Sequence, residues 1–463
     1  MNNIDVTSPF DGSSIRSVPA TDAAAAEKAL QRAHDLYTDR AGWLDAETRV
    51  HVLEAFMALA LSRKEDLAQQ AAHEGGKPLR DSQIEIERAI EGVKVAIAEI
   101  PLLHGTEIPM GLNAASNQRV AHTFREPRGV VLAISAFNHP FNLIIHQAVT
   151  AVAAGCPVLV KPASATCLSA MSIVEMLSEA GLPDGWCQLI LTSNEVTESI
   201  VKDERISFMT FIGSARVGWH LRSQLAPGAS CAMEHGGVAP VIIDETADLD
   251  AALPPLTRGG FYHAGQVCVS VQRIYVHRSI VEDFAKRLVE SVSKLKVGDP
   301  LDLATDVGPL INPGEVDRVD EWVQEAKSDG AQILIGGKKL SPTTYAPTVL
   351  LEPKDSSTIS QQEVFGPVVA IYAFDDIDVA IERANSLNVC FQASIFTSNL
   401  NTALGVSRRL NGMAVMVNDH TAFRVDWMPF GGSKLSGLGM GGIGHTMRDM
   451  TLERMVVWHS PAL

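Results

Sequence analysis

Between residues 130 and 212, short apolar segments alternate with helix-like segments, and this alternation constrains the fold more than any other feature. The apolar segments are short and β-branched, as buried strands are; they are Val130–Ser135, Pro157–Lys161, Gln188–Thr192 and Ile206–Ile212. Helical periodicity marks the segments between them, which are Leu143–Ala154, Thr166–Glu179 and Glu195–Val201. Such an alternation predicts a parallel, doubly wound α/β sheet, which binds ligands at the carboxyl ends of its strands.

A second series of the same kind follows Pro240. Its predicted elements are Leu249–Ala264, Val271–His277, Val281–Leu295, Pro309–Gly330, Val368–Phe374, Asp378–Asn385, Ser394–Thr397 and Met413–Asn418. Residues 22–100, in contrast, have the apolar spacing of amphipathic helices and predict a surface layer. We therefore expect two α/β domains, the first ending near Glu234, with the chain crossing between them at Gly236-Gly237.

Composition excludes several classes of partner. The 463 residues are 46% hydrophobic, which is enough for a large core, and the formal net charge of −16 argues against nucleic acid or an anionic membrane as partner. The longest apolar stretch, Ala148–Val160, is too short to span a bilayer. The N-terminus has no signal-peptide pattern, and the six cysteines have no metal-site or disulfide-framework spacing. A cytoplasmic protein without a metal is the expectation.

One cysteine stands in a context that suggests chemistry. Cys268 follows Gly265-Gln266-Val267, and the upstream cluster Cys231–Pro240 offers the carboxylate of Glu234 beside two glycines. A lone cysteine usually packs as a small hydrophobe. A thiol with a carboxylate base, however, supplies covalent catalysis at a carbonyl followed by hydrolysis.

Glycine-rich runs give one misleading and one credible nucleotide signal. The run Gly437–Gly442 matches GxGxxG, but the chain ends before the βαβ unit that this motif requires could follow. The run Phe211–Gly218 comes after a strand and opens a helix, so its free N–H groups suit a phosphate. Lys161 ends another strand, where it either contacts a ribose or phosphate or is an ordinary solvated lysine.

Together these motifs resemble the aldehyde dehydrogenase superfamily, from about Thr7 to the C-terminus. The resemblance rests on Phe137–Pro140, Lys161-Pro162, Phe211–Ser214 with Val217-Gly218, Glu234–Gly237, Gly265–Cys268, Asp306–Leu310, Glu363–Pro367 and Pro429–Lys434, in this order. It implies an α/β fold with two doubly wound domains, nucleotide-binding and catalytic, plus a small β oligomerisation arm. The implied limits are residues 1–108 and 128–235, residues 236–430, and residues 109–127 with 444–463. A homodimer or homotetramer is also implied.

The resemblance further implies roles for individual residues. Cys268 corresponds to the nucleophile, Asn138 to the oxyanion donor and Glu234 to the base that activates water to hydrolyse a thioester. The implied cofactor is NAD or NADP, and the matching contacts are Lys161, Ser164, Gly213, Ser214, Val217, Glu363 and Phe365. Relatives that pass the acyl group to coenzyme A typically lack the carboxylate, so Glu234 favours a free acid as product.

Several positions depart from the family pattern. Ser164 stands where strict NAD enzymes commonly have Glu, which makes NADP admissible because no carboxylate repels a 2′-phosphate. His235 and Val238 replace a common Leu and Lys, and His235 either tunes Glu234 or fills space. Asn388–Phe391 replaces a common Tyr-Gly-Leu after the family's Asn, without an evident functional reason.

The segment Asn418–Asp426 resembles subgroups that act on small polar or anionic aldehydes, such as lactaldehyde or succinate semialdehyde. This segment makes Phe423 and Arg424 candidate substrate contacts, and the Phe-Asn-His-Pro variant at Phe137–Pro140 adds His139, which stands where the family usually places a pocket-lining aromatic residue. Arg424 either holds a substrate anion or pairs with Asp426 or Asp419. Two alternatives to the hydrolytic enzyme remain open: a coenzyme-A-acylating aldehyde dehydrogenase and a catalytically silent structural relative.

Overall fold

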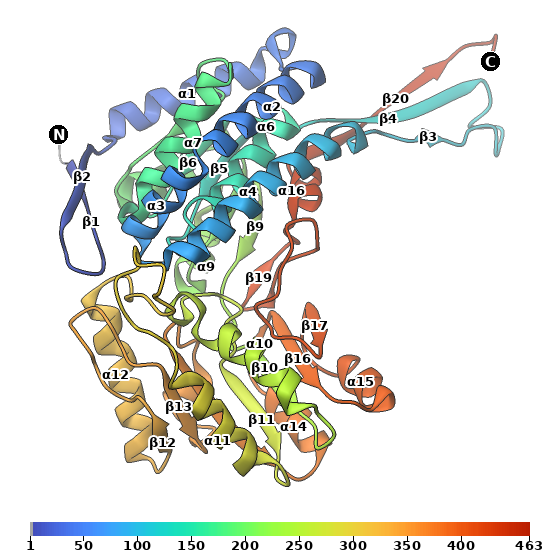
Figure 1. Ribbon diagram of the computed structural model, residues 1–463. Helices are drawn as coiled ribbons and strands as arrows, with labels where there is room; N and C mark the ends of the chain where they lie inside the picture. Colours follow the sequence, from blue (N-terminus) through green and yellow to red (C-terminus); the bar gives the residue numbers. More distant parts are fainter. Residues whose placement is uncertain (1–2) are drawn as a thin grey trace.

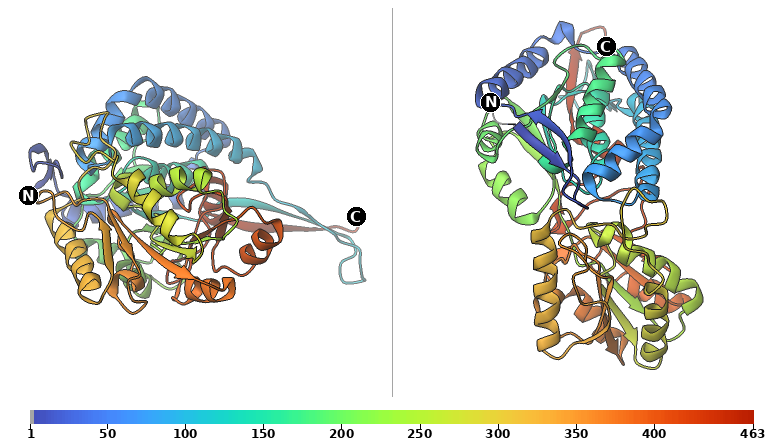
Figure 2. Two further views of the ribbon diagram at one scale, coloured as in Figure 1. Left: turned by 60° about the horizontal axis from the view of Figure 1, so that its bottom comes forward. Right: turned by 60° about the vertical axis from the view of Figure 1, so that its left-hand side comes forward.

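The computed structural model describes residues 3–463, which form two α/β lobes and a projecting β arm (Figure 1). The first lobe contains most of the N-terminal half of the chain and the second most of the C-terminal half. The arm extends away from both lobes and carries the C-terminus toward its tip (Figure 2). The predicted α/β class with two doubly wound domains is confirmed.

A six-stranded sheet forms the centre of the first lobe, in the order β19-β9-β8-β5-β6-β7. Its strands are β5 Val130–Ile134, β6 Val158–Lys161, β7 Cys187–Leu189, β8 Ile206–Ile212, β9 Ser230–Glu234 and β19 Gly437–Leu438. All neighbours are parallel except β19, which is antiparallel to β9. Because every residue of β5 is buried, this strand lies at the heart of the lobe, as its continuous apolar sequence predicts.

Helices cover both faces of this sheet and form the predicted N-terminal layer. They are α1 Ala23–Thr38, α2 Ala46–Ser62, α3 Lys64–Gly75, α4 Leu79–Glu99, α5 Asn142–Ile144, a π-helical turn at Ile145–Val149, α6 Thr150–Ala154, α7 Cys167–Glu179, α8 Asn194–Val201, α9 Ala215–Gln224 and α16 Ile443–Asp449. The side chains of Asp22 and Asp45 cap α1 and α2 by accepting from free backbone N–H groups. An N-terminal hairpin, β1 Asn3–Thr7 with β2 Ser14–Pro19, lies beside the layer.

The second lobe is built on a seven-stranded sheet in the order β12-β13-β14-β11-β10-β16-β17. The strands are β10 Pro240–Ile243, β11 Arg273–His277, β12 Gln332–Ile335, β13 Thr348–Leu351, β14 Val368–Phe374, β16 Gln392–Phe396 and β17 Ala414–Val417. Its principal helices are α10 Leu249–Phe261, α11 Val281–Val292, α12 Pro313–Ser328, α13 Thr358–Gln361, α14 Ile377–Asn385 and α15 Leu400–Ser407. Only β12 runs antiparallel to its neighbour in this sheet.

The arm is a three-stranded antiparallel sheet of β3 Glu107–Ile108, β4 Arg119–Pro127 and β20 Thr451–His459. The arm includes most of the two segments predicted for it, residues 109–127 and 444–463. Its C-terminal strand, however, begins at Thr451 and not at residue 444. Helix α16 packs in the first lobe instead, where Ile443, Met447 and Met450 are fully buried in the core. On a thin arm the nonpolar face of α16 would be exposed to water. In the first lobe this face packs against α4 and α6 and is buried.

Candidate active site

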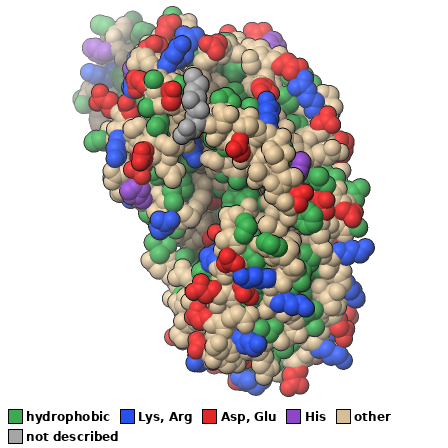
Figure 3. All heavy atoms as spheres, turned by 90° about the vertical axis from the view of Figure 1, so that its left-hand side faces the viewer, with side chains coloured by type: hydrophobic (Ala, Val, Ile, Leu, Met, Phe, Trp, Pro, Cys, Tyr) green, Lys and Arg blue, Asp and Glu red, His purple; other side chains and the backbone are tan. Residues whose placement is uncertain are grey.

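A cavity of about 740 Å³ lies where the two lobes meet, and it collects almost all the predicted site residues. Asn138, Lys161 and Gly213 line it from the first lobe, at or after the carboxyl ends of strands. Cys268 and Glu363 line it from the second lobe. Figure 3 shows one side of the molecule, with acidic and basic side chains mixed over both lobes. The volume is that of a cofactor-sized site.

The loop that carries Cys268 is held in an unusual backbone shape. It follows a short 3-10 turn, Tyr262–Gly265, in which His263, Ala264 and Gly265 all have positive φ. A Cβ on Gly265 would collide with the carbonyl of Gly366, so only glycine permits this approach. The side chain of Gln266 donates to the Pro309 carbonyl and accepts from the Ile311 N–H, which anchors the loop from below.

Glu234 ends β9 and meets the thiol directly. The Cys268 Sγ lies 3.8 Å from Glu234 Oε1, in position to donate its proton. Burial raises the pKa of Cys268 well above its usual value, and the carboxylates of Glu234 and Glu363 add to this while Arg424 opposes it. Burial also raises the pKa of Glu234, again with Arg424 opposing. The carboxylate is therefore a stronger base than a solvated glutamate.

Asn138 occupies the loop after β5 and is buried. One N–H of its side-chain amide donates to the Gln266 carbonyl, at 3.0 Å. Because an amide nitrogen has two hydrogens, the second remains available on the cavity side. This bond ties the oxyanion donor of the first lobe to the nucleophile loop of the second.

The rest of the cavity suits a nicotinamide dinucleotide. Helix α9 begins there at Ala215, and the side chain of the preceding residue, Ser214, makes no capping bond, so the first N–H groups of the helix are free for phosphate. Lys161, at the end of β6, and Val217 also line the cavity. Glu363 Oε1 is buried and, within residues 3–463, has no hydrogen-bond partner. An unsatisfied carboxylate at this point fits the hydroxyl groups of a ribose.

The neighbourhood of Glu363 shows why a glycine is needed opposite it. A Cβ on Gly236 would collide with the Glu363 carboxylate. Phe365, which also lines the cavity, has a φ of +46° and packs edge-on against Phe137 with ring centroids 5.8 Å apart. Burial raises the pKa of Glu363 to about 8.

Two predicted positions lie away from the cavity wall. Ser164 is exposed at the start of a short 3-10 turn, and the cavity is lined by its neighbours Lys161 and Ala163 instead. Phe423, predicted to contact substrate, has a side chain that is 42% exposed and does not line the cavity. In this irregular segment Ala422 and Arg424 face the cavity, and the residue between them turns to solvent.

Arg424 and His139 do reach the cavity. Arg424 lies over the ring of Phe430, with its guanidinium carbon 3.6 Å from the centroid, and its buried Nε has no partner in the described chain. Within residues 3–463 no hydrogen bond joins it to Asp426 or Asp419. Asp426 is instead bonded by a separate set of side chains, those of Arg88, Asn142 and His146. Arg424 therefore makes no direct hydrogen bond to either aspartate in the described residues, although the negative charge of Asp426 still acts on it.

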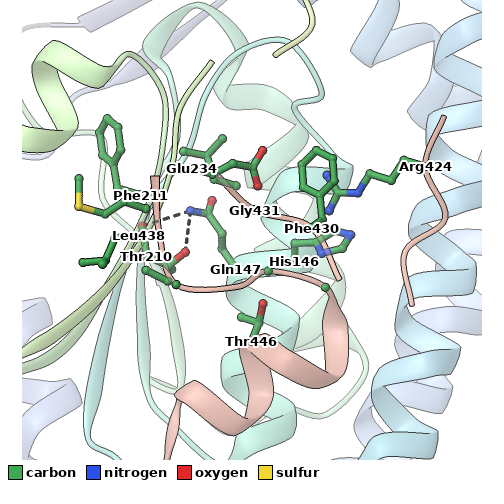
Figure 4. Close-up of a pocket in the computed structure, with 16 residues that line it drawn as sticks. His146, Gln147, Thr210, Phe211, Glu234, Arg424, Phe430, Gly431, Leu438 and Thr446 are labelled. Carbon is green, nitrogen blue, oxygen red and sulfur yellow. Dashed lines mark hydrogen bonds between the residues drawn. The ribbon is translucent and has the colours of Figure 1, made fainter. Parts of the chain in front are cut away.

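A smaller cavity of about 40 Å³ lies behind Glu234 (Figure 4). The π-helical turn brings His146 and Gln147 to its wall, and Gln147 donates to the backbone and side-chain oxygens of Thr210. Glycines of the GxGxxG match also line this cavity, while β19 within that match pairs with β9. The run therefore supports the strand that carries Glu234 and does not open a βαβ unit.

The two unexplained sequence departures have structural roles. His235 packs between Phe211 and Trp219, and its Nδ1–H donates to the Gly213 carbonyl at 2.9 Å, so it supports the phosphate turn. Phe391 packs on Phe430 with centroids 4.9 Å apart, and so supports the ring that carries Arg424. Both contacts depend on residues distant in sequence, which the sequence patterns do not reveal.

Some lining residues were not predicted. Arg216 lines the cavity near the start of α9, Trp322 and Arg318 line it from α12, and Arg88 and Tyr262 line it near His139. Arg216 had a detectable signal, because it lies inside the phosphate run. The others lie in ordinary amphipathic helices or next to a motif.

Among residues 3–463, no helix combines the length and hydrophobicity that crossing a bilayer requires.

Comparison with known proteins identifies the family. The model of the aldehyde dehydrogenase family matches residues 1–456. A 3-sulfolactaldehyde dehydrogenase of Priestia aryabhattai is 40% identical over 410 residues, which are 88% of this chain and 86% of that protein.

Two solved structures are also similar. The aldehyde dehydrogenase 21 of Physcomitrella patens, in complex with its reaction product succinate, is 33% identical, has a TM-score of 0.95 and aligns over 99% of this chain and 95% of its own. A glyceraldehyde-3-phosphate dehydrogenase of Methanocaldococcus jannaschii, complexed with NADP, is 32% identical with a TM-score of 0.94, over 99% and 100%. The chain belongs to the aldehyde dehydrogenase family and is an NAD(P)-dependent oxidoreductase.

Proposed function

We propose that this enzyme oxidises a small anionic aldehyde to the free carboxylic acid, with Cys268 as nucleophile and Glu234 as base. The observation that carries the proposal is the 3.8 Å contact between Cys268 Sγ and Glu234 Oε1, in the same cavity as Asn138 and Glu363. A thiol beside a carboxylate base, facing an oxyanion donor, is the arrangement that acyl chemistry through a thioester requires.

In the first half-reaction the Cys268 thiol transfers its proton to Glu234, and the thiolate attacks the aldehyde carbon. The resulting thiohemiacetal oxyanion accepts hydrogen bonds from the Asn138 amide and the Cys268 backbone N–H. The nicotinamide cofactor, when bound, supplies the hydride acceptor that converts the thiohemiacetal to a thioester. Gly213, Ser214 and Val217 would hold its phosphates, while Lys161, Glu363 and Phe365 would hold its riboses and ring.

Glu234 then releases the thiol proton to solvent, and in the second half-reaction the ionised carboxylate removes a proton from water as the water oxygen attacks the thioester carbon. The carbon–sulfur bond then breaks, which releases the acid and the Cys268 thiolate, and protonated Glu234 returns its proton to the sulfur to restore the thiol. The raised pKa of Glu234 makes it a suitable base for this step. The position of the carboxylate beside Sγ favours hydrolysis over transfer to coenzyme A.

A panel of aldehydes with NAD and with NADP, each with and without coenzyme A, tests this proposal. We expect NAD(P)H formation without coenzyme A, and a free acid as product. A strict requirement for coenzyme A would establish the acylating alternative. Absence of turnover with every aldehyde, in protein shown to bind nucleotide, would establish the silent relative.

Arg424 and the relatives together favour an anionic substrate. Arg424 lines the cavity beside His139, and its Nε is unsatisfied in the described structure. The relatives named above act on 3-sulfolactaldehyde or glyceraldehyde-3-phosphate or release succinate, so each handles a small molecule with an anionic group. A guanidinium presented to the cavity can hold such a group and fix the aldehyde against Cys268.

Replacing Arg424 by leucine is expected to cost about 2–4 kcal/mol of transition-state binding for an anionic aldehyde, because a charged hydrogen-bond pair is lost. A neutral aldehyde of equal length should lose far less. The measurement is kcat/KM for succinate semialdehyde and for an uncharged analogue. Equal losses for the two substrates would show that Arg424 supports the Phe430 packing and does not contact the substrate.

Replacing Ser164 by glutamate is expected to raise the KM for NADP far more than that for NAD, because a carboxylate at the end of β6 repels a 2′-phosphate. Steady-state kinetics with both cofactors measure the change. Ser164→Gln is the uncharged control of equal size and should leave the ratio nearly unaltered. If Ser164→Glu leaves the preference unchanged, the exposed position lies too far from the ribose, and Arg216 becomes the residue to vary.

A further inference from the structure

A buried ion pair lies beneath the oxyanion donor and has no place in the reaction as described. Lys77 and Glu85 form a salt bridge in which the two side chains are 1% and 0% exposed. Lys77 stands in the turn between α3 and α4, and Glu85 lies two turns into α4. Neither side chain lines the cavity, so neither can touch the substrate or cofactor there.

Both members of the pair bond to the loop that carries Asn138. Lys77 Nζ donates to the backbone carbonyl of Asn138 at 3.2 Å. Glu85 Oε1 accepts from the backbone N–H groups of Phe141 and Asn142, at 3.0 and 2.9 Å. The pair is thus hydrogen-bonded to this segment at Asn138 and again at Phe141 and Asn142, where α5 begins.

A further hydrogen bond connects Asn138 to the loop that carries Cys268. Asn138 Nδ2 donates to the carbonyl of Gln266, two residues before Cys268. Lys77 and Glu85 therefore lie at one end of a continuous chain of hydrogen bonds that ends beside the thiol. Since oxyanion stabilisation depends on the donor lying within a few tenths of an ångström of its optimum, a fixed Asn138 backbone has direct value for the rate.

Stability alone does not account for such a pair. Removing two charges from water costs several kcal/mol per ion, and hydrophobic replacements of buried ion pairs are often neutral or stabilising. We propose that the Lys77–Glu85 pair is a positioning device that holds Asn138 in the geometry for oxyanion stabilisation. This inference rests on the oxyanion role proposed above for Asn138.

The test uses Lys77→Met with Glu85→Gln in one protein. Methionine fills the space of the lysine stem, and glutamine keeps an oxygen for the Phe141 and Asn142 N–H groups, so no unpaired buried charge remains. The rate of the first turnover, followed as the NAD(P)H burst, is expected to fall about 10- to 100-fold. Nucleotide affinity and the KM for aldehyde should change less than about 3-fold, because no cavity residue is altered.

Glu74→Gln is the matched control. Glu74 is another fully buried carboxylate on the preceding helix, and it accepts from the N–H groups of Leu168 and Ser169 at the start of α7. It serves a helix start as Glu85 does but makes no hydrogen bond to Asn138 within the described residues. We expect it to lower the urea midpoint of unfolding while the burst rate stays near wild type.

A double-mutant cycle separates positioning from general damage. Asn138→Ala alone should slow the burst about 100- to 1,000-fold. In the Asn138→Ala background the Lys77→Met/Glu85→Gln change should add less than about 3-fold, because the group it positions is gone. Full additivity of the two effects would overturn the inference. A wild-type burst in Asn138→Ala would instead overturn the proposed role of Asn138, which is a distinguishable result.

Glu85→Gln by itself provides a second variant, in which the glutamine oxygen can still accept from Phe141 and Asn142 but Lys77 is left without its buried carboxylate partner. It leaves Lys77 in place, removes the charge that holds the lysine, and should slow the burst about 3- to 10-fold without altering KM. If the pair variant does not fold, this single variant decides the matter in the same cycle with Asn138→Ala. An unchanged burst rate in Glu85→Gln contradicts the inference.

Discussion

Replacing Cys268 by alanine is expected to abolish aldehyde oxidation while nucleotide binding stays intact. The thiol is the only side-chain group in the proposed scheme that forms a bond to the substrate carbon, so no residual covalent path remains. We expect the steady-state rate to fall at least about 1,000-fold. The Kd for NADP should change little, because the phosphate turn at Gly213 and Ser214 lies on the other lobe.

NAD(P)H absorbance in the presence of saturating aldehyde gives the rate, and quenching of tryptophan fluorescence gives the nucleotide affinity. Cys231→Ala is the control for loss of a thiol as such. Cys231 lies on β9 three residues before Glu234 but does not line the main cavity, so this variant should keep its activity. A near wild-type rate in Cys268→Ala would mean that a different nucleophile, or none, operates.

The sequence predicted the α/β fold because its strands are short, buried and regularly separated. β5, β6, β8 and β14 all form within two residues of their expected limits. Elements without such a pattern were missed. β9 and β19 are short strands in glycine-containing segments, and their pairing depends on residues about 200 positions apart.

The residues of the candidate site also differ in whether the local sequence predicts them. Cys268, Glu234 and Asn138 lie in local motifs, and the structure brings them together in one cavity. Phe423 and Arg424 were predicted from a segment without regular structure, where sequence does not indicate which way a side chain points. The burial of Lys77 and Glu85 could not be predicted from the sequence. Lysine and glutamate near a helix start are usually solvated, and here tertiary packing buries them.

Replacing Glu234 by glutamine is expected to separate the two halves of the reaction. Glutamine keeps the shape of the side chain beside Cys268 but cannot remove a proton from water. One equivalent of NAD(P)H per active site should still form, after which the enzyme should stall as a thioester. The steady-state rate should fall about 100- to 10,000-fold. Intact-mass measurement should show the acyl adduct, and it should be absent from Cys268→Ala.

Hydroxylamine supplies a control for the stalled state, since it attacks a thioester without needing a base. Added to the stalled Glu234→Gln adduct after free aldehyde has been removed, since aldehydes themselves form oximes with hydroxylamine, it should release the hydroxamate and restore the free Cys268 thiol, while Cys268→Ala should yield no hydroxamate. A Glu234→Gln enzyme that cycles at the normal rate would show that another group activates the water.

The pH dependence of the steady-state rate follows from the raised pKa of Glu234. The carboxylate must be ionised to accept a proton, and burial shifts its ionisation to higher pH. In the wild type, deacylation should therefore increase with pH until Glu234 is fully ionised. In Glu234→Gln this rise should be missing from the residual rate of thioester hydrolysis.

The burst in Glu234→Gln carries a second piece of information, because its amplitude and its rate depend on different roles of the carboxylate. The amplitude depends only on whether the thioester survives, so loss of the water-activating base leaves it at one per site. The rate depends on how the Cys268 thiol loses its proton, and burial with the neighbouring carboxylates holds the pKa of that thiol well above its usual value. If Glu234 is the acceptor of this proton, as the 3.8 Å contact between Sγ and Oε1 indicates, the burst should be slow as well as complete. A burst of full amplitude at the wild-type rate would confine Glu234 to deacylation and assign the thiol proton to water in the cavity.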